Sequence, residues 1–169
     1  MTEPTVYQFH VTRLNGDEVS LSEYQNKVLL IVNTASECGF TPQLDTLELL
    51  KQAYSESDFE ILAFPSNDFG AQEPLEGEAI AEFCSINHGT TYTVFDKIHV
   101  KGDEAHPLYK FLSDKKLNGR VNASPRWNFH KYLINQQGEV IDFFYPFTDP
   151  MSSKIKKSIS KLLAANKNS

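Results

Sequence analysis

The sequence predicts an α/β fold, and three observations lead to this expectation. Two short apolar runs, 28–32 and 59–66, are rich in residues that favour strands, and each is followed further along by helical spacing of apolar residues. A turn signal near the start, Asn15-Gly16, and a second one at 135–139 each lie between two strand-like segments. Because strands that alternate with helices form sheets covered by helices, we expect a central sheet with helices on its faces.

The first elements are predicted to be a β-hairpin and a central strand. Residues 6–14 and 18–24 flank Asn15-Gly16, a dipeptide that favours hairpins because both residues tolerate a positive φ. Residues 28–32 form a continuous apolar run, which is typical of a strand buried on both faces. This run therefore predicts a strand inside a sheet that contains parallel pairs.

A helix, a second buried strand and another helix are expected next. Thr41 and Pro42 are typical of an N-cap and a first helical position, because the proline lacks only an N–H that the helix cannot pair there. The residues that follow at helical spacing are Leu44, Leu47, Leu50 and Tyr54. The strand at 59–66 then precedes a helix at 76–89 that ends near Gly89.

The remaining segments complete the layout. A short segment lies around 95–100, and 106–116 is expected to be helical. Segments 132–134 and 140–145 flank the turn "NQQGE" and predict a second hairpin, and Asp149-Pro150 predicts the start of a last helix. A hairpin, a β-α-β half and a β-β-α half together make a thioredoxin-like fold with a central mixed sheet, and we expect residues 1–169 to form one domain.

Composition excludes several classes of protein. The chain has 169 residues, of which 40% are hydrophobic, so it can form a core without disulfides. No run approaches the length of a membrane span, and the polar start "MTEPTVYQFH" does not predict secretion, so we expect a cytoplasmic protein. A net charge of -6 argues against a nucleic-acid partner. The lysine-rich segment at 152–169 is interpreted as a solvated helix face, with docking of an anionic molecule as the alternative.

The first of only two cysteines, Cys38, lies in "VNTASECGFT", between a predicted strand and a predicted helix. Ligands usually bind at the carboxyl end of such strands, and a helix N-terminus favours a thiolate. This position alone leaves open a reactive or a buried structural cysteine. Thr41 stands three positions later, so no C-x-x-C pair exists, and the five histidines show no ligand spacing with either cysteine that would indicate a metal site.

Three blocks in order resemble the glutathione peroxidase family. They are "VNTASECGFT", "FPSNDFGAQEP" and "WNFHKYLINQQGEVI", and "FDKIHVKGDEAHPLYKFL" joins the last two as in that family. The resemblance covers nearly the whole chain and implies reduction of hydrogen peroxide and organic or lipid hydroperoxides. By position it implies four catalytic residues: Cys38, Gln72, Trp127 and Asn128. Gln72, Trp127 and Asn128 are neutral donors that can hydrogen-bond a thiolate and orient the peroxide.

The resemblance also implies how the enzyme is recycled. Cys84, in "EFCSINHG", matches the resolving cysteine of members reduced by thioredoxin, although a buried structural thiol is the plainer interpretation of that position. Peroxide would convert Cys38 to a sulfenic acid, and Cys84 would then form a disulfide with it, which requires the predicted helix around Cys84 to open. The alternatives are recycling by glutathione without an internal disulfide, and a peroxide sensor that passes oxidation to a partner protein. A non-catalytic relative with a buried Cys38 is a further alternative. No cofactor is expected.

Several positions depart from the family pattern. Ser66 replaces the usual cysteine, which leaves Cys38 and Cys84 as the implied disulfide pair, and Asp68 replaces a glutamine and would oppose thiolate formation if it lies close. Thr93 stands where many thioredoxin-dependent members have proline. The short stretch between Leu112 and Trp127 lacks the insertion that tetrameric members use for assembly, so a monomer is expected.

Overall fold

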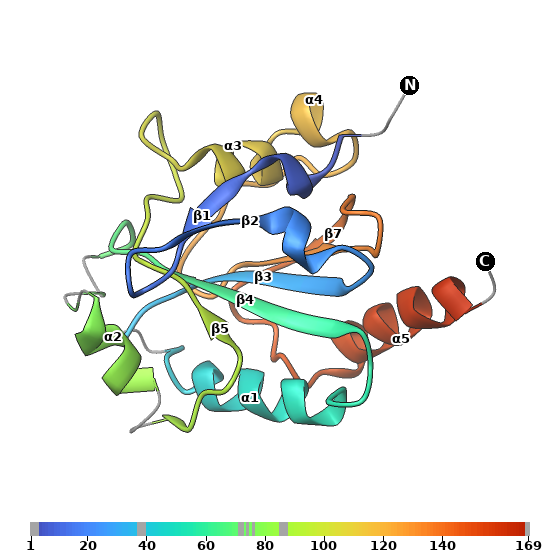
Figure 1. Ribbon diagram of the computed structural model, residues 1–169, viewed down its shortest axis with the longest axis horizontal. Helices are drawn as coiled ribbons and strands as arrows, with labels where there is room; N and C mark the ends of the chain where they lie inside the picture. The colour runs from blue at the N-terminus through green and yellow to red at the C-terminus, as the bar shows by residue number, and fades with distance from the viewer. Residues whose placement is uncertain are drawn as a thin grey trace.

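The structure, a computed structural model, is a mixed five-stranded sheet with helices on both faces and a two-stranded hairpin beside it (Figure 1). It describes residues 4–36, 40–70, 73, 75, 77–84 and 88–167, with side chains up to 165. The strand order is β5-β4-β3-β6-β7. The strands are β3 (Val28–Thr34), β4 (Phe59–Pro65), β5 (Thr93–Val94), β6 (Lys131–Ile134) and β7 (Val140–Phe144). The first three are parallel to one another, and β6 and β7 are antiparallel to their neighbours, which confirms the predicted mixed sheet.

The N-terminal hairpin is shorter than predicted. It consists of β1 (His10–Thr12) and β2 (Glu18–Ser20), and a short 3-10 helix lies on either side, η1 (Val6–Gln8) before β1 and η2 (Leu21–Tyr24) after β2. Ser20 accounts for one of these helices, because its side chain accepts a hydrogen bond from the N–H of Ser22 at the start of η2. In the turn, Gly16 alone of the pair has a positive φ, at 96°.

The first helix, α1 (Gln43–Ala53), begins later than expected, and the prediction of Thr41 as its N-cap is wrong. Pro42 occupies the cap position without a side-chain hydrogen bond. The Thr41 hydroxyl instead donates to the carbonyl of Ala35 at 2.9 Å. This bond ties the residue before Pro42 to the chain just after β3.

The other helices also differ in extent from the sequence pattern. Where a helix is predicted at 76–89, the structure has the shorter α2 (Glu78–Glu82), which continues into a π-helical turn at Phe83 and Cys84. The single helix expected at 106–116 is divided into α3 (Pro107–Ser113) and α4 (Lys115–Asn118), because Asp114 is extended and caps the N–H of Lys116. The last helix, α5 (Ser153–Lys167), starts after Asp149-Pro150, which form a turn in which Asp149 accepts from the N–H of Met151.

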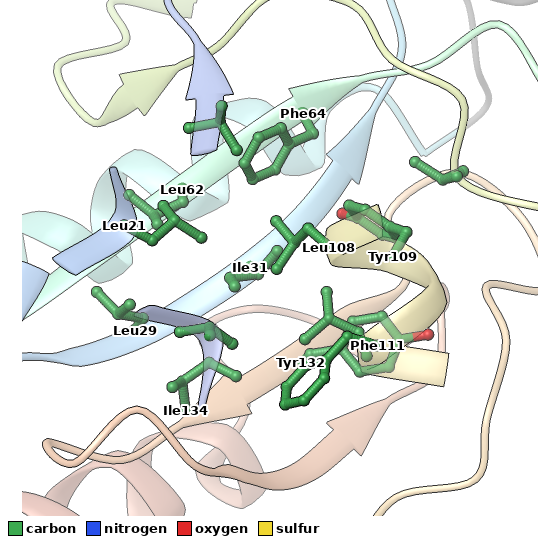
Figure 2. Packing of buried hydrophobic residues seen from close by; sticks show 14 of the residues in the cluster. Leu21, Leu29, Ile31, Leu62, Phe64, Leu108, Tyr109, Phe111, Tyr132 and Ile134 are labelled. Carbon is green, nitrogen blue, oxygen red and sulfur yellow. The ribbon is translucent and has the colours of Figure 1, made fainter. Parts of the chain in front are cut away.

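The core consists of two layers, one on each face of the sheet. All seven residues of β3 are buried, and they alternate between the layers as the period of a strand requires. Leu29 and Ile31 pack with the hairpin and with Leu108 and Tyr109 of α3, as Figure 2 shows. Val28, Leu30 and Val32 pack on the opposite face against α1 and α5. The sheet is therefore rigid at β3, whose carboxyl end leads to the Cys38 segment.

Among the helices of the described segments, none is long and apolar enough to cross a membrane.

Candidate active site

The predicted catalytic residues belong to three segments of the chain, two of which follow β3 and β4 and one of which precedes β6. Cys38 and Gln72 lie outside the described residues, in the segments that follow β3 and β4. Trp127 and Asn128 are described and lie in the turn that precedes β6. β3 is paired in parallel with β4 and antiparallel with β6. The carboxyl ends of β3 and β4 and the start of β6 therefore lie at the same end of the sheet.

Asn33, near the end of β3, holds the turn of Trp127 and Asn128. Its Nδ2 donates to the carbonyl of Trp127 at 3.1 Å, and its own carbonyl accepts from the N–H of Phe129 at 2.6 Å. Phe129 is fully buried and has a φ of 71°, a region that is costly for a non-glycine residue. Such a conformation persists only where its surroundings enforce it, so Asn33 sets the orientation of this turn.

Trp127 links the turn to the loop after β4. Its indole is partly buried and packs against both core layers. The ring centroid lies 5.5 Å from that of Phe69, three residues before Gln72, with the planes inclined at 48°. Asn128, beside it, is fully buried. Trp127 therefore contacts the loop after β4 at Phe69.

Glu73 joins several segments of the site through hydrogen bonds. It is only 3% exposed, and its Oε1 accepts from the hydroxyl of Ser36, two residues before Cys38, at 2.8 Å. Its N–H donates to Oδ1 of Asn67 at 2.9 Å, and its carbonyl accepts from Lys97 Nζ at 2.9 Å. Burial raises the pKa of the Glu73 carboxyl, against the opposing effect of the bond from Ser36. Glu73 thus connects the Cys38 segment to the loop of Gln72.

Cys84 is a buried free thiol, 7% exposed, at the π-helical turn after α2. Burial, with a smaller contribution from the charge of Glu73, raises the pKa of the Cys84 thiol to about 11. Gly77 and Gly89 bound this segment, with φ values of 53° and 58°. Glu73 is thus linked to Ser36 by a hydrogen bond and acts electrostatically on the Cys84 thiol.

The structure shows the surroundings of the three residues that depart from the family pattern. Asp68 is directed toward 99–101: its Oδ2 accepts from the N–H of Val100 at 2.6 Å, and its Oδ1 lies 2.8 Å from Nδ1 of His99. Its charge is therefore matched by His99, whose pKa it raises. Ser66 is fully buried and its hydroxyl accepts from the N–H of Asp68 at 3.3 Å. Thr93 begins β5 and pairs with Leu62 of β4.

Sequence reasoning missed Asn33, Glu73 and Lys131. Asn33 is the second residue of the first block, Glu73 follows Gln72 directly in the second, and Lys131 is the lysine of the third, so the blocks contained all three. Lys131 is fully buried, and its Nζ donates to the carbonyls of Phe129 at 2.6 Å and Pro146 at 3.2 Å. A buried polar residue inside an apolar pattern was the available signal, because such groups need specific partners.

The described parts of the chain contain no group of three or more histidine, cysteine or acidic side chains that could hold a metal ion. A hollow of about 550 Å³ opens beside the Glu73 loop, and it is lined by Leu14, Asn67, Gly77 and 96–99. Lys97 connects this hollow to Glu73.

Comparison with known proteins places the chain among glutathione peroxidases. The family model described as glutathione peroxidase matches residues 6–113. A glutathione peroxidase of Lactococcus lactis is 47% identical over 93% of this chain and 98% of its own length. A probable phospholipid hydroperoxide glutathione peroxidase of Helianthus annuus is 49% identical over 89% of this chain and 82% of its own.

Solved structures give the same result. The crystal structure of Trgpx in its apo form superimposes with a TM-score of 0.75 and 38% identity, covering 96% of this chain and 97% of that one. A thioredoxin-family thiol:disulfide interchange protein of Chlorobium tepidum, with a TM-score of 0.63, 13% identity and coverage of 95% and 94%, shares the fold alone. The thioredoxin-like fold predicted from the sequence is thus confirmed. The chain belongs to the glutathione peroxidase family and is a peroxidase that reduces hydroperoxides with a thiol.

Proposed function

We propose that this peroxidase reduces hydrogen peroxide and organic or lipid hydroperoxides through Cys38, that Cys84 resolves the oxidised enzyme, and that thioredoxin recycles it. In the first step the Cys38 thiolate attacks the terminal peroxide oxygen. The O–O bond breaks, Cys38 becomes a sulfenic acid, and the remainder leaves as water or an alcohol after it takes up a proton. Gln72, Trp127 and Asn128 donate hydrogen bonds to the sulfur and to the peroxide.

The second step forms a disulfide. The Cys84 sulfur attacks the Cys38 sulfur, the S–S bond forms, the S–O bond breaks, and water leaves with the proton of the Cys84 thiol. A dithiol such as that of thioredoxin then supplies two electrons and restores both thiols. No prosthetic group takes part in this cycle.

The position of Cys84 is the observation that supports the two-cysteine cycle most directly. Cys84 lies in a π-helical turn, a wide turn that is rare and found frequently at functional sites. Its segment lies between Gly77 and Gly89, which both have a positive φ, a conformation that glycine adopts at little cost. The raised pKa of Cys84 favours the thiol in the closed state, so opening of this segment would prepare it for attack.

Two alternatives use the same Cys38. The relatives are named for glutathione, so recycling by glutathione, with Cys84 purely structural, is the first. A peroxide sensor that transfers its oxidation to a partner protein is the second. We further propose a cytoplasmic monomer, in keeping with the short connection between α3 and Trp127.

The deciding experiment is intact mass and free-thiol count after one equivalent of hydrogen peroxide. It is made on the wild type, Cys38→Ser and Cys84→Ser. The proposal expects the wild type to lose two hydrogens and both thiols, Cys84→Ser to gain one oxygen on Cys38, and Cys38→Ser to stay unchanged. A wild type that stops at a sulfenic acid with Cys84 still free would overturn the internal disulfide and favour glutathione.

The reductant is then identified by steady-state turnover. With thioredoxin and its reductase, turnover in the wild type and its loss in Cys84→Ser support the proposal. Turnover with glutathione that survives in Cys84→Ser supports the first alternative. Absence of turnover with either reductant, combined with a trapped mixed disulfide to one protein, supports the sensor.

A further inference from the structure

The turn that carries Trp127 and Asn128 is supported by a buried lysine. Lys131, the first residue of β6, is fully buried and pairs across the sheet with Val32 of β3 and Phe144 of β7. Because cross-strand partners share a face, its side chain lies on the face that carries α1 and α5. A lysine at the centre of a sheet is costly, since burial penalises its charge and each N–H needs an acceptor.

The two carbonyls that accept hydrogen bonds from Lys131 belong to separate loops. The first is the carbonyl of Phe129, at 2.6 Å, immediately after Asn128 in the turn. The second is the carbonyl of Pro146, at 3.2 Å, in the loop that follows β7. That same carbonyl accepts from Nε2 of Gln43, the first residue of α1, at 2.8 Å. Lys131 therefore joins the turn of Trp127 and Asn128 to the start of the helix that follows Cys38.

We propose that Lys131 is a positioning residue for peroxide reduction, which fixes the position of the Trp127–Asn128 turn relative to the start of α1, the helix that follows Cys38 in the sequence. The inference rests on the assignment of Trp127 and Asn128 to the active site made above. Asn33 of β3 donates to the carbonyl of Trp127, and Lys131 of β6 donates to the carbonyl of Phe129. These two bonds hold the backbone on either side of Asn128, so they enforce the positive φ of Phe129.

The hydrogen bonds do not depend on the charge of the amine. An ammonium has three N–H groups and a neutral amine has two, and two acceptors are present. The titratable groups that act on or near Lys131 are Asp149, which favours its protonated form, and His130, whose pKa is lowered to about 4 by burial with a smaller contribution from Lys131. The positioning role therefore persists on both sides of neutral pH.

The substitution that tests this role is Lys131→Met, which keeps the length of the side chain and removes its donors. Replacing a buried charged group with a hydrophobic one of similar volume often preserves stability, so the variant is expected to fold. Lys131→Gln retains an amide donor on a shorter chain and serves as the partial rescue. Lys157→Met, on the exposed side of α5, is the matched control.

Two readouts separate positioning from general damage. The first is the rate of Cys38 oxidation by hydrogen peroxide, followed by rapid quenching and mass spectrometry. The second is acrylamide quenching of tryptophan fluorescence, which reports only Trp127 because the chain has a single tryptophan. We expect Lys131→Met to remain folded, to be oxidised at least tenfold more slowly and to show altered quenching. Lys131→Gln should be intermediate, and Lys157→Met should match the wild type.

The outcome that overturns the inference is a folded Lys131→Met with wild-type oxidation and quenching while Asn128→Ala is slow. If Lys131→Met fails to fold, the comparison is made with Lys131→Gln, and a wild-type rate in that variant likewise overturns it. Full activity in Trp127→Phe and Asn128→Ala would instead refute the proposed site itself, which makes the two failures distinguishable.

Discussion

Opening of the Cys84 segment should be controlled by the contacts of α1 with residues 88–92. Glu48 of α1 accepts from the N–H of Thr91 at 2.7 Å and from its hydroxyl at 2.6 Å, and Lys51 Nζ donates to the carbonyl of Thr91 at 2.6 Å. His88 Nδ1 lies 2.9 Å from Asp45 Oδ1 of the same helix. These bonds fasten the chain just beyond Cys84, so Glu48→Ala should release it.

The magnitude follows from the two bonds to Thr91 that the substitution removes. A hydrogen bond contributes about 0.5–1.5 kcal/mol, and these two are partly exposed, so their combined loss is discounted to about 1 kcal/mol. That value corresponds to about a fivefold larger population of the open segment, provided the loss acts on local opening. Alanine is a good helix former, so α1 itself should persist.

The assay is alkylation of Cys84 by iodoacetamide in a Cys38→Ser background, measured by intact mass. Glu48→Ala should raise the alkylation rate about fivefold. Glu56→Ala, at an exposed site beyond α1, is the control and should leave the rate unchanged. The measurement is repeated at low urea concentrations, because local opening responds weakly to urea and global unfolding responds strongly. An alkylation rate in Glu48→Ala equal to that of its parent would refute the reasoning.

Three further predictions concern the buried polar groups. Asn33→Ala should lower the free energy of unfolding by about 1–3 kcal/mol in a urea titration, because it removes the donor to Trp127 and leaves that carbonyl without its Asn33 partner; an unchanged midpoint would contradict this. Glu73→Gln keeps a side chain able to bond Ser36 but removes the negative charge that raises the pKa of Cys84, so the pH profile of Cys84 alkylation in the Cys38→Ser background should move to lower pH. Ser36→Ala keeps that charge and should leave the profile nearly in place. The pKa of Lys131 is lowered by burial to about 7 from 10.5, so the unfolded chain binds more protons between these values and unfolding free energy should rise with pH over that window. Lys131→Met should lack this rise, as urea titrations at pH 6 and 9 would show. An identical pH dependence in the wild type and in Lys131→Met would contradict a lowered pKa of Lys131.

The sequence determined the order of the elements well, because that order depends on local patterns. The continuous apolar runs of β3 and β4 and the stripe of Leu44, Leu47 and Leu50 were visible without tertiary contacts, since they reflect the period of each element. The ends of elements were less predictable. Thr41 has the chemistry of an N-cap, but its hydroxyl bonds Ala35 across a loop, and no local pattern contains that choice.

The candidate site likewise has one part that local sequence patterns predicted and one that depends on tertiary contacts. Motif blocks indicated the family and predicted Trp127 and Asn128 as site residues, because a motif is a local spacing of residues along the chain. The groups that hold them were decided only by tertiary structure: Asn33 faces Trp127 from 94 positions away, and Glu73 reaches Ser36 across 37. A buried hydrogen bond needs two groups at one distance and angle, a condition that packing of the sheet creates and that neither residue carries by itself.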